Sequence, residues 1–204
     1  MAIESLLQNR KIKAGLIAIA SILVICLSSA TWIDKFQRAE KNVHQYWEML
    51  TKNCDQRVEM LPQFAQLVQY YAPQAKDLIQ TLNASYQFAK QYHASEQLLN
   101  SPAGINGYSK LQNQIVGALF QMEQQISTFP NLAQSKQYFM LYKQLNDVEL
   151  QIFFANKSLN RQIESYNRLI TIWPEAWFNA IYPRAKSLYP ASVLTLESFE
   201  KSRN

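Results

Sequence analysis

Apolar residues recur at alternating steps of three and four along most of the chain after residue 40. This spacing keeps apolar side chains on one side of an α-helix, whereas no stretch shows the sustained alternation of a half-buried strand. Four helices with one apolar side each predict an all-α fold, either an antiparallel four-helix bundle of long helices or a long antiparallel coiled coil, and we expect the bundle. The four rows are Val43, Trp47, Leu50, Cys54, Val58 and Leu61; Phe64, Val68, Tyr71, Ala75, Leu78, Leu82, Tyr86 and Ala89; Leu111, Ile115, Leu119, Met122, Ile126 and Phe129; and Tyr138, Tyr142, Leu145, Val148, Ile152, Ala155, Leu159, Ile163, Tyr166, Ile170 and Trp173.

Prolines and glycines divide these rows. Pro62 is expected to open a second helix over residues 63–99, which Pro73 should kink or split. Residues 100–107 contain one proline and two glycines, and they predict the main loop of the domain. An uncharged apolar segment, residues 14–33, precedes the rows and is predicted below to span a membrane. If the helices run alternately up and down, the turn at Pro62 should lie at the end of the domain far from this membrane segment.

The last connections follow the same logic. Phe129-Pro130 predicts a tight turn, also far from the membrane segment, in which Asn131 caps the fourth helix. Trp173-Pro174 should end that helix at the end nearer the membrane segment. The next residues mix large aromatic side chains with cations, a composition favoured at headgroup depth. We therefore consider a contact with the membrane surface or a partner, and we favour slightly the alternative that the aromatics close the end of the bundle. The residues in question are Trp173, Trp177, Phe178 and Arg184.

An uncharged apolar segment, residues 14–33, precedes the domain. Twenty residues of helix span about 30 Å, the thickness of the hydrocarbon core of a bilayer. Arg10, Lys11 and Lys13 flank the segment on one side, and Trp32 lies at interfacial depth on the other. The segment is predicted to be a transmembrane helix.

Two other interpretations of this segment are weighed. A cleavable signal peptide would use the small residues 28–30, but the apolar run continues past them into a helical pattern. A lipid anchor on Cys26 would need small residues before the cysteine, where Val24 and Ile25 stand. We expect a retained single-pass anchor. The clustered N-terminal cations favour a cytoplasmic N-terminus, with the domain on the periplasmic or extracellular side.

Composition adds little specific chemistry. The net charge is +5, part of which comes from the N-terminal flank, and the scattered remainder predicts no nucleic-acid site. His44 and His93 have no ligands at metal spacing, and carboxylates such as Glu123 and Glu149 lack the Glu-x-x-His pairs of di-iron bundles. We expect no catalytic residue, no cofactor and no metal. Polar residues beside the long apolar row, which we interpret as fixing helix register rather than binding a ligand, are Asn156, Asn160 and Asn167.

Three segments resemble a known family in order and spacing. The most specific is the run Arg57-Val58-Glu59-Met60-Leu61-Pro62-Gln63-Phe64, followed by Val68 and Tyr71-Ala72 and preceded by Trp47. The others are Phe129-Pro130-Asn131-Leu132 with Phe139 and Leu145, and Tyr166-Asn167 with Ile170 and Trp173-Pro174. On these motifs the chain resembles the LemA family of bacterial single-anchor membrane proteins. The resemblance implies an N-terminal anchor and a bundle of long helices, and it supplies no catalytic residues.

The chain departs from the family pattern in its fourth row. Val148 to Ile152, Ala155-Asn156 and Leu159-Asn160 lack two arginines that the family carries, and a family glycine is missing before Tyr71. We divide the chain into a basic flank (1–13), the transmembrane helix (14–33), a LemA-like bundle (34–182) and a tail (183–204). The expected function is a helical scaffold or protein-binding module in the bacterial cytoplasmic (inner) membrane, contacting the bilayer and a membrane or envelope protein. The alternative is a domain that binds a lipid or envelope ligand in a groove lined by Tyr and Phe.

Overall fold

The computed structural model describes residues 10–92, 98–99 and 101–171, without the side chains of residues 10–13 and 22–30. Every regular element in these ranges is helical, which confirms the all-α prediction. In chain order, the described elements are α2 (Arg10–Tyr71), α3 (Lys76–Lys90), α4 (Pro102–Ile126), α5 (Pro130–Ala133) and α6 (Lys136–Thr171).

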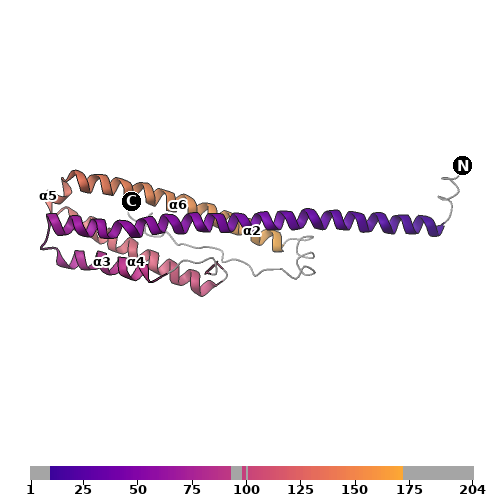
Figure 1. Ribbon diagram of the computed structural model, residues 1–204, viewed down its shortest axis with the longest axis horizontal. Helices are drawn as coiled ribbons and strands as arrows, with labels where there is room; N and C mark the ends of the chain where they lie inside the picture. The colour runs from indigo at the N-terminus through magenta and orange to yellow at the C-terminus, as the bar shows by residue number, and fades with distance from the viewer. Residues whose placement is uncertain (1–9, 93–97, 100, 172–204) are drawn as a thin grey trace.

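Helix α2 is the central element of the fold, because α3 and α6 both pack against it. α6 runs antiparallel along it: the Tyr71 hydroxyl donates a 2.9 Å hydrogen bond to Gln137 at one end, and the rings of Phe36 and Tyr166 lie 5.2 Å apart at the other. α3 also packs on α2, and α4 packs on α3. Figure 1 shows these helices running alternately up and down, while the N-terminal part of α2 projects beyond them.

The predicted apolar rows form one continuous core. All six residues of the first row are buried, and so are most members of the third and fourth. The fourth row differs in detail, because Tyr138, Tyr142 and Val148 are only partly buried and the polar residues Glu149 and Asn156 lie inside. α4 and α6 meet through side chains rather than through close backbone packing, so the closed four-helix bundle remains a prediction.

The predicted helix boundary at Pro62 is wrong, because α2 continues through this residue to Tyr71. Pro62 has no N–H for the Val58 carbonyl, a loss that costs about 3 kcal/mol inside a helix. Leu61, Phe64 and Val68 continue the buried side across the proline, and each such burial contributes about 1.5–3 kcal/mol. The apolar row therefore outweighs the proline.

The break comes instead at residues 72–75, where Pro73 was expected to kink or split the second helix. α2 ends at Tyr71, α3 begins at Lys76, and backbone hydrogen bonds from Ala72 to Val68 and from Ala75 to Ala72 close the turn. The turn far from the N-terminal part of α2 is thus this one rather than Leu61-Pro62.

The predicted loop at residues 100–107 is mostly helix, because α4 begins at Pro102. Ser101 caps this helix, its Oγ accepting a 3.1 Å hydrogen bond from the backbone N–H of Gly104. A Cβ on Gly104 would lie 2.8 Å from Leu98, and the Tyr92 hydroxyl donates to the Gly104 carbonyl at 3.0 Å. The glycine therefore marks a close approach of the preceding segment to α4 rather than a loop.

Asn131 is not the cap of the last long helix. It lies within the single turn α5, and Ser135 takes the capping role, accepting a 3.1 Å hydrogen bond from the N–H of Tyr138. The tight turn after Phe129 is present, but the residue that caps α6 is Ser135, four residues after the predicted Asn131.

The predicted transmembrane segment, residues 14–33, falls in the projecting part of α2, and the side chains of residues 22–30 lie outside the described residues. Among the described residues, no helix has an apolar stretch long enough to cross a membrane, so the structure does not support this prediction. Leu16, Ile17 and Ile19 are exposed. Trp32, expected at the membrane interface, is buried with its ring stacked 5.4 Å from that of Phe36.

Candidate functional site

A buried polar cluster joins three helices at the centre of the domain. Arg57 of α2 is 1% exposed, and its Nη1 donates to both carboxylate oxygens of Glu149 of α6 at 3.0 Å. Its Nη2 donates to the side-chain oxygen of Gln112 on α4. No hydrogen-bond partner is found for its Nε among the described residues. One guanidinium thus fixes α2, α4 and α6 relative to each other.

Electrostatics make this cluster sensitive to the loss of either charge. Burial alone would lower the pKa of Arg57, but the Glu149 carboxylate offsets this effect and holds the pKa above its usual value. An uncompensated charge at this depth is strongly unfavourable. The arrangement supports the fold and contains no exposed group that could act on a substrate.

Cys54 and Tyr108 lie beside this cluster. Both are buried, and the ring of Tyr108 contacts Trp47 edge-on at 5.4 Å. Burial raises the pKa of the Cys54 thiol and raises that of the Tyr108 hydroxyl well above its usual value. A protonated, enclosed thiol is unreactive, since the thiolate is the nucleophile.

A second polar contact links α4 to α6. Burial raises the pKa of Glu123, against the effect of its hydrogen bond with Tyr142, and the ring of Tyr142 stacks 5.7 Å from that of Tyr138. Tyr138 also meets Phe64 of α2 edge-on at 6.3 Å. This half-buried carboxyl retains its proton to higher pH than an exposed one.

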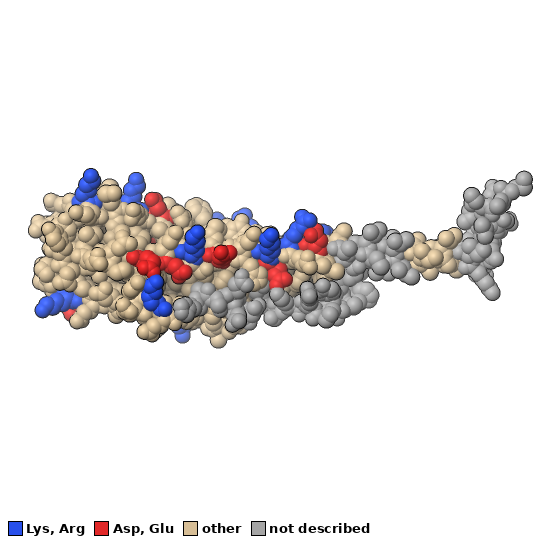
Figure 2. Space-filling view, viewed as in Figure 1, with Lys and Arg blue, Asp and Glu red and all other residues tan. Residues whose placement is uncertain are grey.

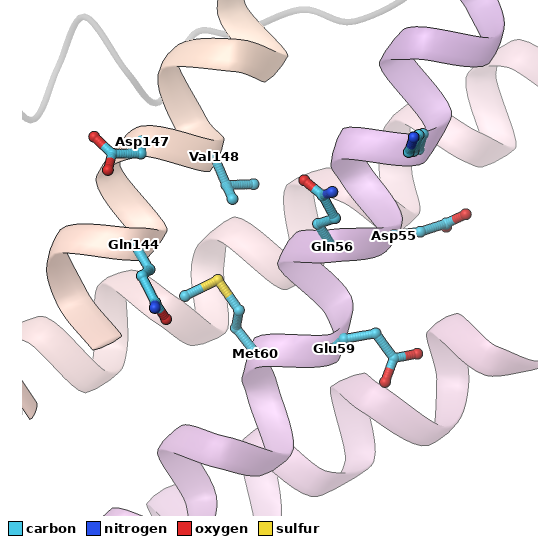
Figure 3. A pocket seen from close by; sticks show the side chains of 8 residues that line it. Asp55, Gln56, Glu59, Met60, Gln144, Asp147 and Val148 are labelled. Atoms are coloured by element: carbon cyan, nitrogen blue, oxygen red, sulfur yellow. The ribbon is translucent and has the colours of Figure 1, made fainter. Parts of the chain in front are cut away.

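An open groove of about 540 Å³ lies between α2 and α6. In Figure 3, Met60 and Val148 point into the gap, whereas Asp55, Glu59 and Asp147 point away from it. The carboxylates therefore do not converge, and among the described residues no three metal-binding side chains form a group. No Tyr or Phe lines the groove, whose lining residues are Lys52, Asp55, Gln56, Glu59, Met60, Gln144, Asp147 and Val148.

The outer side of α6 exposes an apolar patch that the sequence analysis did not identify. Leu150, Phe153 and Phe154 are 51%, 40% and 60% exposed, and the two phenylalanine rings lie 5.5 Å apart. Phe139 and Met140 are exposed further toward the start of the same helix. Residues at i, i+3 and i+4 share one helix face, so the spacing of this patch was visible in the sequence.

The surface charge has no single sign over the face seen in Figure 2, where Lys and Arg lie interspersed with Asp and Glu. An exposed ion pair between Lys90 and Glu59 ties α3 to α2 beside the groove. Exposed pairs of this kind contribute little to stability.

The residues singled out from the sequence are distributed as follows. Trp173, Trp177, Phe178 and Arg184 lie outside the described residues, as does His93. His44 lies 3.8 Å from Glu40 of the same helix. Asn156 is buried, whereas Asn160 and Asn167 are half-buried, and their role in helix register remains a prediction.

The comparisons with known proteins give one positive result. The search against curated proteins found no match. The LemA family model matches residues 46–192, a range that includes the C-terminal part of α2 and all of α3 to α6. This match covers most of the chain and agrees with the motifs around Arg57 and Phe129. The chain belongs to the LemA family.

Proposed function

We propose that this protein is a membrane-anchored helical scaffold that binds another protein of the bacterial envelope. The observation that carries the proposal is the outer side of α6, where Leu150, Phe153 and Phe154 stay exposed although most of the apolar residues on the opposite side of the helix are buried. Exposed apolar patches on soluble domains are typical of interaction surfaces. A four-helix arrangement braced by the Arg57 cluster would give this surface a rigid support.

The alternative, a lipid- or ligand-binding groove, has less support. The groove between α2 and α6 is open, is lined by four charged side chains and contains no aromatic residue. Small-molecule sites are usually enclosed and mostly apolar or aromatic. The chemistry of the described residues also gives no reason to propose catalysis.

The proposed anchor rests on the apolar residues 14–33 and on the exposed Leu16, Ile17 and Ile19. Full-length protein should stay in the membrane pellet during an alkaline carbonate wash, whereas a shortened chain starting at Thr31 should be soluble. Release of the intact protein by the wash would contradict the anchor. The start at Thr31 keeps Trp32, which belongs to the core.

The proposed orientation places the domain outside the cytoplasmic membrane. A cysteine introduced near the C-terminus, with Cys26 and Cys54 replaced by Ser, should react with an impermeant thiol reagent on intact cells. Reaction only after the membrane is ruptured would reverse the orientation.

Protein binding is tested by a photoreactive amino acid placed at position 154 of the full-length protein in cells. Illumination should give an adduct with the mass of a second protein. The matched control is position 120, because Phe120 of α4 is similarly exposed, at 48%, but lies on another helix. Adducts at neither position, with lipid as the only co-purifying molecule, would favour the alternative.

A further inference from the structure

The exposed side of α6 has the pattern of a second helix-packing seam. Lys143, Asp147, Leu150, Phe154, Lys157 and Arg161 follow one another at steps of 4, 3, 4, 3 and 4 residues, and all six are exposed. This is the spacing at which one helix meets another along a coiled coil. The buried seam on the opposite side of α6 is occupied by α2, so the outer seam is left for another occupant.

The charges of this outer seam are arranged around its apolar centre. Lys143 lies before the centre, and Lys157 and Arg161 lie after it. None of these three cations has an ion-pair partner among the residues that the structure describes. Asp147 is the one carboxylate between Lys143 and Arg161 on this seam, which is therefore net positive.

We propose that the outer seam of α6 binds an acidic amphipathic helix of another protein. The apolar side of that helix would cover Leu150, Phe153 and Phe154, and its carboxylates would face the cations on either side. The seam from Lys143 to Arg161 is about 27 Å long at 1.5 Å per residue, which corresponds to between two and three heptads of a partner helix. This inference rests on the proposed function and specifies the chemistry of the partner.

The charges of the seam do not favour a second copy of this chain. If Leu150 of one copy faced Phe154 of the other in antiparallel pairing, Lys143 of one copy would face Arg161 of the other, while Asp147 would face Lys157, so that repulsion and attraction offset each other. Parallel pairing would place each cation opposite itself. Like charges in direct opposition are unfavourable in helix pairing.

Two other occupants fit the charges less well. Residues 172–204 contain four Lys and Arg against three Asp and Glu, so they do not complement a positive seam. An anionic bilayer would attract the cations, but α6 runs alongside α2 (Figure 1). If α2 enters the membrane end-on, as the proposed anchor requires, the outer seam faces sideways rather than toward the lipid.

The test uses full-length protein in non-ionic detergent and a fluorescein-labelled synthetic peptide of three heptads, with Leu at positions a and d and Glu at positions e and g. A control peptide carries Lys in place of Glu. Fluorescence anisotropy should show binding of the acidic peptide and weaker or no binding of the Lys peptide. Affinity should fall steeply with added salt, because the contacts are between exposed charges.

Variants locate the peptide on the seam. Lys157→Glu and Phe154→Ser should each weaken binding of the acidic peptide about tenfold, the loss expected for a contact worth about 1.4 kcal/mol. Lys110→Glu, an exposed cation on α4, is the matched control and should leave binding unchanged. Reversing Lys143, Lys157 and Arg161 together should transfer the preference to the Lys peptide.

Several results would overturn the proposal. Equal binding of the two peptides, or binding that Phe154→Ser leaves intact, excludes an acidic helix on this seam. Binding to phosphatidylglycerol vesicles but not to the peptide, sensitive to the same variants, identifies a lipid surface instead. A doubled mass in light scattering that Phe154→Ser abolishes identifies a second copy. A cross-link from position 154 to the chain's own tail identifies an intramolecular cover.

The proposed function and this inference can fail separately. An adduct with another protein at position 154, without binding of the acidic peptide, retains the binding module and rejects the chemistry inferred for its partner. Absence of both results rejects the α6 surface as the binding site.

Discussion

Replacement of Glu149 by Leu leaves the Arg57 guanidinium buried with Gln112 as its remaining side-chain partner. Arg57 is 1% exposed and makes two 3.0 Å contacts to the carboxylate that the substitution removes. Removing one member of such a buried pair costs about 3–5 kcal/mol, mostly because the other charge stays desolvated. We expect Arg57→Met alone to cost a similar amount, since it leaves the carboxylate buried.

The double variant, Arg57→Met with Glu149→Leu, separates this explanation from loss of packing. Both charges are then absent, the volumes are similar, and Gln112 loses one hydrogen bond worth about 1 kcal/mol. The double variant should be less stable than the natural protein by only about 1–2 kcal/mol, which is much less than the sum of the two single losses. The coupling between the two sites should therefore exceed about 2 kcal/mol.

The measurement is urea unfolding of the chain starting at Thr31, followed by circular dichroism at 222 nm. An unchanged dependence on urea shows that the variants unfold from the same compact state. Phe120→Ala on the exposed side of α4 is the control and should change stability by less than about 0.5 kcal/mol. Single variants that lose less than about 1 kcal/mol, or a double variant as unstable as the sum, would falsify the role assigned to the buried pair.

The remaining predictions concern packing and ionisation. Ile152→Ala should cost about 2–5 kcal/mol in urea unfolding because Ile152 is fully buried, whereas Phe154→Ala should cost less than about 0.5 kcal/mol; equal effects would contradict the register of α6. Pro62→Ala should stabilise the fold by about 1–3 kcal/mol, since it restores the N–H donor inside α2; a loss of stability would show that the proline is required there. Burial raises the pKa of Tyr138 from 10.0 to about 12, so the unfolded chain loses this proton first and the free energy of unfolding should fall from pH 10 to pH 12. Tyr138→Phe should make that fall smaller. The same fall in the variant would contradict this role of Tyr138. Burial also raises the pKa of Glu123 above 4.5. Its contribution to the free energy of unfolding is therefore fully present below pH 4.5 and is lost as the pH rises through the pKa of the folded state. Glu123→Gln should reduce this pH dependence, as measured by urea unfolding at several pH values.

The periodicity of the sequence was sufficient to predict that the chain is helical and to predict most of the core, although not the helix boundaries. Steps of three and four place Trp47, Leu50 and Cys54 on one helix side whatever that side packs against, and all three are buried. The turn chemistry was less informative. Pro62 and Gly104 both lie inside helices, because the packing of the surrounding residues outweighs a local preference that costs only about 1–3 kcal/mol.

The candidate site depended on tertiary structure. Arg57 and Glu149 are 92 residues apart, and nothing in the local pattern of either helix shows that they pair. The sequence likewise contains both seams of α6, one through Ile152 and one through Leu150 and Phe154, at nearly the same spacing. Only the packing of α2 against the first seam leaves the second exposed, because a helix buries the side that its neighbour covers, and the choice of neighbour is made by contacts distant in sequence.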